Sequence, residues 1–136
     1  MLPRMTATSG SAPARQLTAI VVDDDADLLG ALRFSLELDG LRVIAHHKAE
    51  TVDAATLPLT DACLVLDYKL PSANGLDLLD QLRAAGVTLP AILVTSHASA
   101  EVRRRTREAD AVLIEKPLLG ETLVTAIRAA IARRQS

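Results

Sequence analysis

Acidic, hydroxyl and amino side chains follow four separate apolar runs of this 136-residue chain. Each run is short, aliphatic and bounded by polar residues, which is typical of buried parallel strands. In an open parallel sheet the carboxyl ends of the strands meet at one edge, where such folds place their ligand sites. That edge would gather Asp23, Asp24, Asp67, Thr95 and Lys116. Together these side chains suit a divalent cation and a phosphoryl group.

The three aspartates are candidate ligands of a metal ion. Their carboxylates would repel one another at a shared edge, and a hard cation would relieve that repulsion. Mg²⁺, with Mn²⁺ as an alternative, takes oxygen ligands from carboxylates, water and phosphate. The competing explanation is that consecutive aspartates after a strand cap the next helix, as we expect of Asp25. Capping does not account for Asp67, so we expect Asp23, Asp24 and Asp67 to form a Mg²⁺ site.

Lys116 and Thr95 could bind the phosphoryl group itself. Lys116 precedes Pro117, and a residue before proline is held extended or enters a cis bond. Its ammonium group can pair with a carboxylate or phosphoryl oxygen as a point charge. The Thr95 hydroxyl could donate to a phosphoryl oxygen, or it could close a turn at the end of a strand.

The composition predicts one domain with an aliphatic core. The chain is 49% hydrophobic, yet Phe34 and Tyr68 are its only aromatic residues. The single cysteine, Cys63, lies within an apolar run and is expected to be buried. A net charge of −2 gives no reason to expect binding to nucleic acid or to a membrane. Without a secretory signal or a span of roughly 18 apolar residues, we expect a soluble cytoplasmic protein.

Strand and helix patterns alternate along the chain. Residues 1–16 are rich in Pro, Ser, Thr, Gly and Ala and are expected to form a disordered leader before one domain over 17–134. Strands are predicted over 17–22, 41–46, 62–66, 90–95 and 111–115, and helices over 25–38, 49–55, 75–85, 99–108 and 119–133. Five βα units predict a flavodoxin-like, doubly wound α/β fold with a five-stranded parallel sheet in the order 2-1-3-4-5.

Four segments carry a family resemblance. In order and spacing, IVVDDD, LVLDYKLPSANG, ILVTSHAS and LIEKPL resemble the receiver domain of two-component response regulators. The D-x₃-P-x₃-G signature of that family is met by Asp67, Pro71 and Gly75. The resemblance covers about residues 17–133. Around Asp67, Thr95 and residues 115–118, the sequence is similar to the receivers of nitrogen-fixation transcription regulators.

The resemblance implies a role for each site residue. Asp67 is the expected phosphoacceptor, taking a phosphoryl group from a histidine kinase or a histidine phosphotransfer protein. Asp24, Asp67 and the backbone carbonyl of Lys69 would ligate Mg²⁺, with Asp23 acting through a metal-bound water. Thr95 and Lys116 would hold phosphoryl oxygens. Conformational roles fall to Pro71, Gly75 and Pro117.

The resemblance also implies surfaces for partners. The face built from residues 99–108, 111–115 and 119–133 would bind a downstream protein or a second copy of the chain after phosphorylation. The first helix, with Leu28, Leu29 and Phe34, would dock the histidine-bearing partner. The protein would act by phosphorylation-dependent binding or as a relay carrier, and would catalyse only its own phosphorylation and dephosphorylation. We expect a stand-alone receiver, with an excised domain of a longer protein as the alternative.

Three positions depart from the family pattern. Leu113 stands where the family usually has an aromatic switch residue, which puts the coupled threonine–aromatic rearrangement in doubt. Lys69 and His97 occupy positions that flank the path of the hydrolytic water. We hypothesise that both tune the lifetime of the phosphoryl group, with Lys69 pairing with it and slowing hydrolysis. The alternative is that both are solvated loop side chains.

The sequence also offers two alternative functional classes and two interpretations of one charged helix. A dehalogenase-type phosphatase would need an aspartate where Lys69 stands, which argues against that class. An interaction module that works without phosphorylation is the remaining alternative, because Leu113 stands in place of the usual aromatic switch residue. The helix over 99–108 has four arginines on its surface, either solvated or facing an acidic partner or a second copy: Arg103, Arg104, Arg105 and Arg107.

Overall fold

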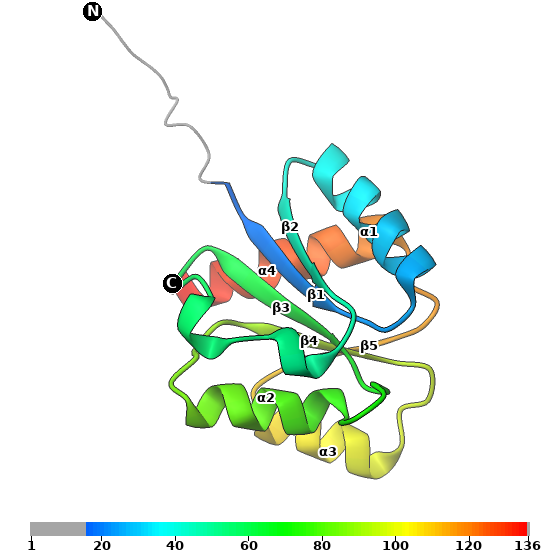
Figure 1. The fold of residues 1–136 in the computed structure, drawn as a ribbon, viewed down its shortest axis with the longest axis vertical. Helices are drawn as coiled ribbons and strands as arrows, with labels where there is room; N and C mark the ends of the chain where they lie inside the picture. Colours follow the sequence, from blue (N-terminus) through cyan, green and yellow to red (C-terminus); the bar gives the residue numbers. More distant parts are fainter. Residues whose placement is uncertain (1–15, 136) are drawn as a thin grey trace, which may run out of the picture.

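The computed structural model describes residues 16–135, so the expected leader lies, apart from Gln16, outside the described residues. A five-stranded, wholly parallel sheet forms the centre of the fold (Figure 1). Its strands are β1 (Thr18–Val22), β2 (Arg42–His46), β3 (Ala62–Asp67), β4 (Ala91–Thr95) and β5 (Val112–Glu115). Their order across the sheet is β2-β1-β3-β4-β5, which confirms the predicted flavodoxin-like topology.

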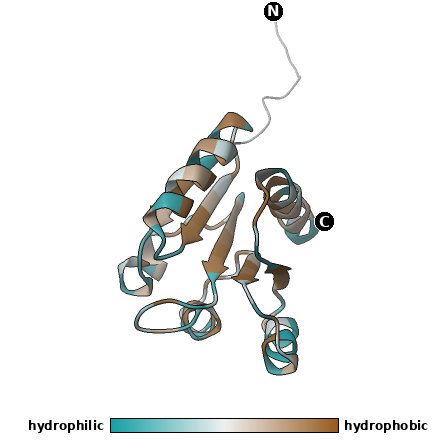
Figure 2. Ribbon diagram, turned by 90° about the vertical axis from the view of Figure 1, so that its right-hand side faces the viewer, coloured by the Kyte–Doolittle hydropathy of each residue, from teal (hydrophilic) through white to brown (hydrophobic). Residues whose placement is uncertain are grey.

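Helices cover both faces of the sheet (Figure 1). They are α1 (Ala26–Leu38), α2 (Gly75–Ala84), α3 (Ala100–Glu108) and α4 (Gly120–Gln135). Side chains of α1 and α4 pack with one layer of strand residues, and those of α2 and α3 pack with the other. Figure 2 shows the hydrophobic strands between helices that carry hydrophilic residues. Within residues 16–135, no helix is long and apolar enough to cross a membrane.

Local hydrogen bonds begin and end the helices that flank the site. Asp25 caps α1 as expected, because its Oδ1 accepts from the backbone N–H groups of Asp27 and Leu28, both at 3.1 Å. Asn74 caps α2 in the same way, accepting from the N–H of Asp77 at 2.8 Å. Gly86 follows α2 with φ at +94°, a conformation in which glycine is favoured. These caps fix where α1 and α2 begin, directly beside the carboxyl edge of the sheet.

The predicted helix over 49–55 is wrong. Two short 3₁₀ turns, Ala49–Thr51 and Ala54–Thr56, replace it and connect β2 to β3. Asp53 is extended between them, with φ −110° and ψ 114°, and its Oδ1 accepts from the N–H of Ala55 at 3.0 Å. The Thr51 hydroxyl donates to the carbonyl of Lys48 at 3.0 Å. These side-chain bonds to the backbone compete with a continuous helix.

Cys63 is buried within β3, as predicted. Its burial in the aliphatic layer raises the pKa of the thiol to about 12, which keeps the group protonated at neutral pH. The thiol is therefore part of the core and has no place in the chemistry at the edge of the sheet.

Candidate functional site

Four parallel strands deliver the predicted site residues to one edge of the sheet. Asp67 and Thr95 are the last residues of β3 and β4, while Asp23 and Lys116 lie just beyond the ends of β1 and β5. The strand register sets Val22 opposite Leu66, Asp67 opposite Val94, and Thr95 opposite Glu115. The strands therefore end at nearly the same level, which brings the polar side chains together.

Lys116 forms the ionic contact at the centre of the site. Its Nζ lies 3.3 Å from Oδ1 of Asp67 and 3.7 Å from Oδ2 of Asp23. Both carboxylates are almost fully buried, and the peptide bond between Lys116 and Pro117 is cis. The remaining Asp23 oxygen, Oδ1, accepts from the N–H of Asp25 at 2.9 Å. One ammonium group thus faces two buried carboxylates, one of which is oriented by the start of α1.

The electrostatics of the site act most strongly on Asp67. Burial is the main cause that raises the pKa of its carboxyl group, and the charge of Asp23 adds to this effect. The ammonium group of Lys116 acts in the opposite direction but does not cancel the shift. A further positive charge at this position would stabilise the ionised form of Asp67.

The three aspartates have the geometry of a divalent-cation site. Carboxylate oxygens of Asp23, Asp24 and Asp67 all lie within 4.8 Å of one another. Oxygen ligands from carboxylates are those that Mg²⁺ and Mn²⁺ prefer. Because burial and mutual repulsion already oppose the ionised Asp67, a cation among these oxygens would offset both effects. The residues therefore fit a hard divalent ion.

The Thr95 hydroxyl forms a turn with the segment that follows β4. It donates to the carbonyl of His97 at 3.0 Å and accepts from the N–H of the same residue at 3.2 Å. This is the strand-end turn that the sequence allowed as an alternative. Thr95 nevertheless lies on the same cleft as Asp67, so its hydroxyl would have to leave His97 in order to reach a phosphoryl group.

A cleft of about 630 Å³ opens above the carboxyl edge of the sheet. Seven residues that the sequence predicted line it: Asp23, Asp24, Asp67, Lys69, Thr95, His97 and Lys116. Leu113 does not, because it is half-buried in the apolar layer beside α2 and α3. The backbone and side chains that line the cleft thus include every predicted charged group of the site.

The other three predicted positions, Pro71, Gly75 and Pro117, do not line the cleft. Pro71 and Pro117 are exposed. Gly75 is buried at the start of α2, where its N–H donates to the carbonyl of Tyr68 at 2.8 Å. A Cβ atom at Gly75 would lie 2.5 Å from the backbone oxygen of Asp67 and 2.9 Å from Cδ1 of Leu93. Glycine therefore allows α2 to begin against the backbone of Asp67.

Apart from Tyr68, three polar residues that the sequence analysis did not assign to the cleft line it: Asp25, Ser96 and Ser99. Ser99 caps α3 by accepting from the N–H of Val102 at 3.1 Å. Their only signal in the sequence is proximity to Asp24 and Thr95, because caps and turn residues are common after any strand.

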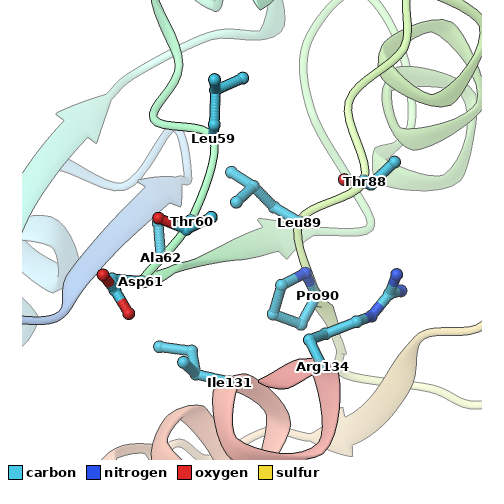
Figure 3. Close-up of a pocket in the computed structure, with 9 residues that line it drawn as sticks. All are labelled: Leu59, Thr60, Asp61, Ala62, Thr88, Leu89, Pro90, Ile131 and Arg134. Carbon is cyan, nitrogen blue, oxygen red and sulfur yellow. The ribbon is translucent and has the colours of Figure 1, made fainter. Parts of the chain in front are cut away.

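A second cleft, of about 240 Å³, lies at the opposite edge of the sheet. Residues before β3, residues before β4 and the end of α4 surround it (Figure 3). Its charged lining residues are Asp61 and Arg134, and Arg134 is paired with Asp110 at 3.2 Å. The two ends of the parallel strands thus differ sharply, and the carboxyl end carries the acidic cluster.

The arginines of α3 pair with carboxylates of this same chain. Arg103 contacts Glu115 of β5 at 3.1 Å, and Arg104 contacts Glu101 and Glu108 within α3. These pairs offset the positive charge of Arg103 and Arg104. They therefore weaken the alternative that this arginine-rich helix face binds an acidic partner.

The fold and the edge cluster define a receiver domain, and comparison with protein families agrees. The model of the response regulator receiver domain matches residues 19–128, and the chain belongs to this family. The general function of the family is signalling in two-component systems through a phosphoryl-accepting aspartate.

Individual relatives support the assignment. The chain is 33% identical over 114 residues to the transcriptional regulatory protein FixJ of Azorhizobium caulinodans, covering 83% of this chain and 54% of FixJ. It is 31% identical over 121 residues to the C4-dicarboxylate transport transcriptional regulatory protein DctD of Pseudomonas aeruginosa, covering 88% of this chain and 26% of DctD. The chain thus spans about half of one relative and a quarter of the other.

Solved structures show the same fold. A CheY-like receiver domain protein from Methanospirillum hungatei JF-1 superposes with a TM-score of 0.80 at 24% identity, covering 88% of this chain and 97% of that one. The crystal structure of FixJ-N superposes with a TM-score of 0.76 at 29% identity, covering 87% and 95%.

Proposed function

We propose that Asp67 accepts a phosphoryl group and that the phosphorylated domain signals by binding a partner protein or by passing the group on in a relay. One observation carries this assignment: Nζ of Lys116 lies 3.3 Å from a buried Asp67 carboxylate whose neighbours are Asp23 and Asp24. A lone ion pair would need one carboxylate only. Two additional acids at the same edge suit a site for a cation and a doubly charged group.

The proposed reaction is an in-line phosphoryl transfer. A carboxylate oxygen of Asp67 attacks phosphorus, the bond from phosphorus to the donor breaks, and the bonding electrons leave with the donor. For a phosphohistidine donor the leaving atom is a ring nitrogen. Lys116 is placed to pair with the oxygens of the phosphoryl group while charge develops on them. Thr95 would donate its hydroxyl to a phosphoryl oxygen once it leaves His97.

The acidic cluster would hold Mg²⁺, or Mn²⁺ as an alternative, through Asp24, Asp67 and the backbone carbonyl of Lys69, with Asp23 acting through a bound water. When bound, the ion would neutralise charge on the phosphoryl oxygens during transfer. Asp23 has a second duty that needs no ion, because it pairs with Lys116 and accepts from Asp25. It therefore helps to hold the ammonium group of Lys116 at the site in the absence of an ion.

We propose a histidine kinase or a histidine phosphotransfer protein as the donor, docking on α1, in the cytoplasm. The output would be a downstream protein or a second copy bound on the face formed by α3, β5 and α4. An apolar groove of about 640 Å³ on that face supports this surface, with Val112, Ile114 and Leu119 among its lining residues. We propose no direct role in binding nucleic acid or membranes, and no enzymatic reaction beyond the domain's own phosphorylation and dephosphorylation.

The test of the proposed function is phosphorylation by a small donor. Incubation with acetyl phosphate and Mg²⁺ is expected to add the mass of one phosphoryl group to the intact protein. Neither the Asp67→Asn variant nor wild-type protein in excess chelator should gain mass, because each lacks one component of the site. Mass spectrometry over time gives the extent and the rate.

The control for this test is Asp53→Asn, which changes an exposed aspartate that caps a 3₁₀ turn and is not among the residues lining the cleft. It should be phosphorylated like wild type. A folded wild-type protein that gains no mass from acetyl phosphate or from phosphohistidine donors would favour an interaction module that works without phosphorylation.

Lys69 is expected to prolong the lifetime of the phosphoryl group. Its side chain is exposed and lines the cleft beside Asp67, where the ammonium group can pair with phosphoryl oxygens and obstruct an attacking water. Lys69→Ala should therefore raise the rate of dephosphorylation up to about fivefold, which is the effect of an exposed charge contact worth up to about 1 kcal/mol. The decay of the phosphorylated mass after removal of the donor measures this rate.

His97 provides the comparison for Lys69, since it lines the same cleft from the segment after β4. A His97→Ala variant tests whether it also tunes the lifetime. Decay rates of Lys69→Ala equal to wild type would show that Lys69 is a solvated loop side chain.

A further inference from the structure

Helix α3 has the weakest apolar attachment of the four helices. Its only buried side chains among the described residues are Val102 and Thr106, and the hydroxyl of Thr106 donates to the carbonyl of Val102. Helix α2, by contrast, buries four leucines: Leu76, Leu78, Leu79 and Leu82. Since each buried aliphatic side chain contributes roughly 1.5–3 kcal/mol, α3 gains far less from the core than α2 does. Polar contacts therefore have a large share in deciding where α3 lies.

One guanidinium group connects α3 to α2. Nη2 of Arg105 lies 3.1 Å from Oδ1 of Asp77 and 3.0 Å from Oδ2 of Asp80. Only 27% of the Arg105 side chain is exposed, compared with 52% of Arg103 and 48% of Arg104, although Asp77 and Asp80 are 52% and 63% exposed. The single positive charge of Arg105 also offsets the repulsion between two like charges one helical turn apart on α2. We name the contact of Arg105 with Asp77 and Asp80 the α2–α3 tie.

The tie joins two helices that both begin at the site. Helix α2 starts directly after the segment that follows Asp67, and Asp77 lies in its first turn. Helix α3 starts after the segment that follows Thr95, with Ser99 as its cap. When the Thr95 hydroxyl donates to a phosphoryl oxygen, it can no longer donate to the carbonyl of His97. The segment leading into α3 then has one hydrogen bond fewer at its site end, while the tie still holds α3 to α2.

We propose that the α2–α3 tie is a latch: Arg105 keeps α3 in its resting position, and phosphorylation at the site must overcome this contact to move α3. Only the second half of this inference, that phosphorylation must overcome the Arg105 contact, rests on the proposed function. The first half, that Arg105 fixes α3 against α2, concerns the unphosphorylated protein and can be measured in it.

Hydrogen–deuterium exchange of the full chain tests the latch, with Arg105→Gln as the variant. Loss of the tie should accelerate exchange of α3 amides roughly two- to fivefold in the unphosphorylated protein, as expected for partly sheltered ion pairs. Arg104→Gln is the matched control, because within residues 16–135 the ion pairs of Arg104 are with Glu101 and Glu108 of α3 itself. Salt adds a second test that requires no mutation. At 1 M ionic strength, where screening extends over about 3 Å, wild-type exchange should approach that of Arg105→Gln.

Phosphorylation by acetyl phosphate tests the second half. In wild type it should accelerate exchange in α3, and in Arg105→Gln it should add much less, because the latch is already open. Equal exchange of α3 in Arg105→Gln and Arg104→Gln would overturn the latch. Equal acceleration by phosphorylation in wild type and Arg105→Gln would overturn the second half of the proposal, that phosphorylation must overcome the Arg105 contact to move α3. A wild-type protein that takes no phosphoryl group would refute the proposed function and, with it, the second half of the proposal. Exchange in the unphosphorylated proteins would still decide whether Arg105 holds α3 against α2.

Discussion

Alanine in place of Gly75 is expected to destabilise the fold and to displace the proposed phosphoacceptor. The added Cβ would lie 2.5 Å from the backbone oxygen of Asp67, closer than real Cβ atoms approach other heavy atoms. Backbone cannot move aside as a flexible side chain can, so the start of α2 or the end of β3 must shift. Overpacking of this kind costs on the order of 1–3 kcal/mol. Urea denaturation measures the loss of stability.

The same substitution should slow phosphorylation of Asp67 on the order of ten- to a hundredfold, because a displaced nucleophile loses its alignment. The matched control is Gly30→Ala on α1, where an added Cβ meets no atom within 4 Å. Alanine there should be neutral or stabilise by roughly 0.5–1 kcal/mol, since it favours the helix. If Gly75→Ala keeps both the stability and the phosphorylation rate of wild type, the close approach of α2 to Asp67 has no functional role.

Asparagine in place of Asp67 is expected to raise the thermal stability of the protein at pH 7 in the absence of divalent ions. Burial and the charge of Asp23 raise the pKa of Asp67, which means that the fold opposes its ionised form. Asparagine keeps the shape of the side chain and removes the charge, so the melting temperature should rise by several degrees. Calorimetry measures this shift, and Asp24→Asn, at an exposed position, should give a smaller one.

The sign of the pH dependence follows from the direction of the pKa shift. The unfavourable contribution of Asp67 is absent below the ordinary carboxyl pKa of about 4, where the group is protonated in both states, and it develops as the pH rises toward the higher folded pKa. The advantage of Asp67→Asn should therefore be present at pH 7 and vanish in acid. Mg²⁺ should raise the melting temperature of wild type more than that of Asp67→Asn. An advantage that persists unchanged below pH 4 would contradict this explanation.

The strands and the edge cluster could be predicted from the sequence because two simple patterns determine them. Aliphatic runs mark buried parallel strands, and a right-handed crossover fixes their order. Once the order is known, residues that end the strands must lie at one edge. The proximity of Asp23, Asp67 and Lys116 was therefore predictable, although their distances were not.

Other features depend on contacts that no local pattern encodes. Arg105 is separated by 28 and 25 residues from the two aspartates that it contacts, and a sequence shows only that an arginine lies on a helix surface. The segment over 49–55 has helix-forming residues at both ends, but Asp53 bonds the backbone of the following turn and interrupts the helix. The hydroxyl of Thr95 could have faced either the cleft or its own turn, and the choice depends on the position of His97.

The assembly of the cleft from four strands also affects the folding of this protein. Asp23 and Lys116 lie near opposite ends of the domain in sequence, yet they meet only when β1, β3, β4 and β5 are all in place. Contacts between distant segments form late and slow the search for the native state. A chain that is incomplete or partly folded lacks either the nucleophile's neighbours or the ammonium group. The proposed phosphoacceptor site is therefore complete only in molecules in which these four strands have paired, so we expect phosphorylation of fully folded molecules alone.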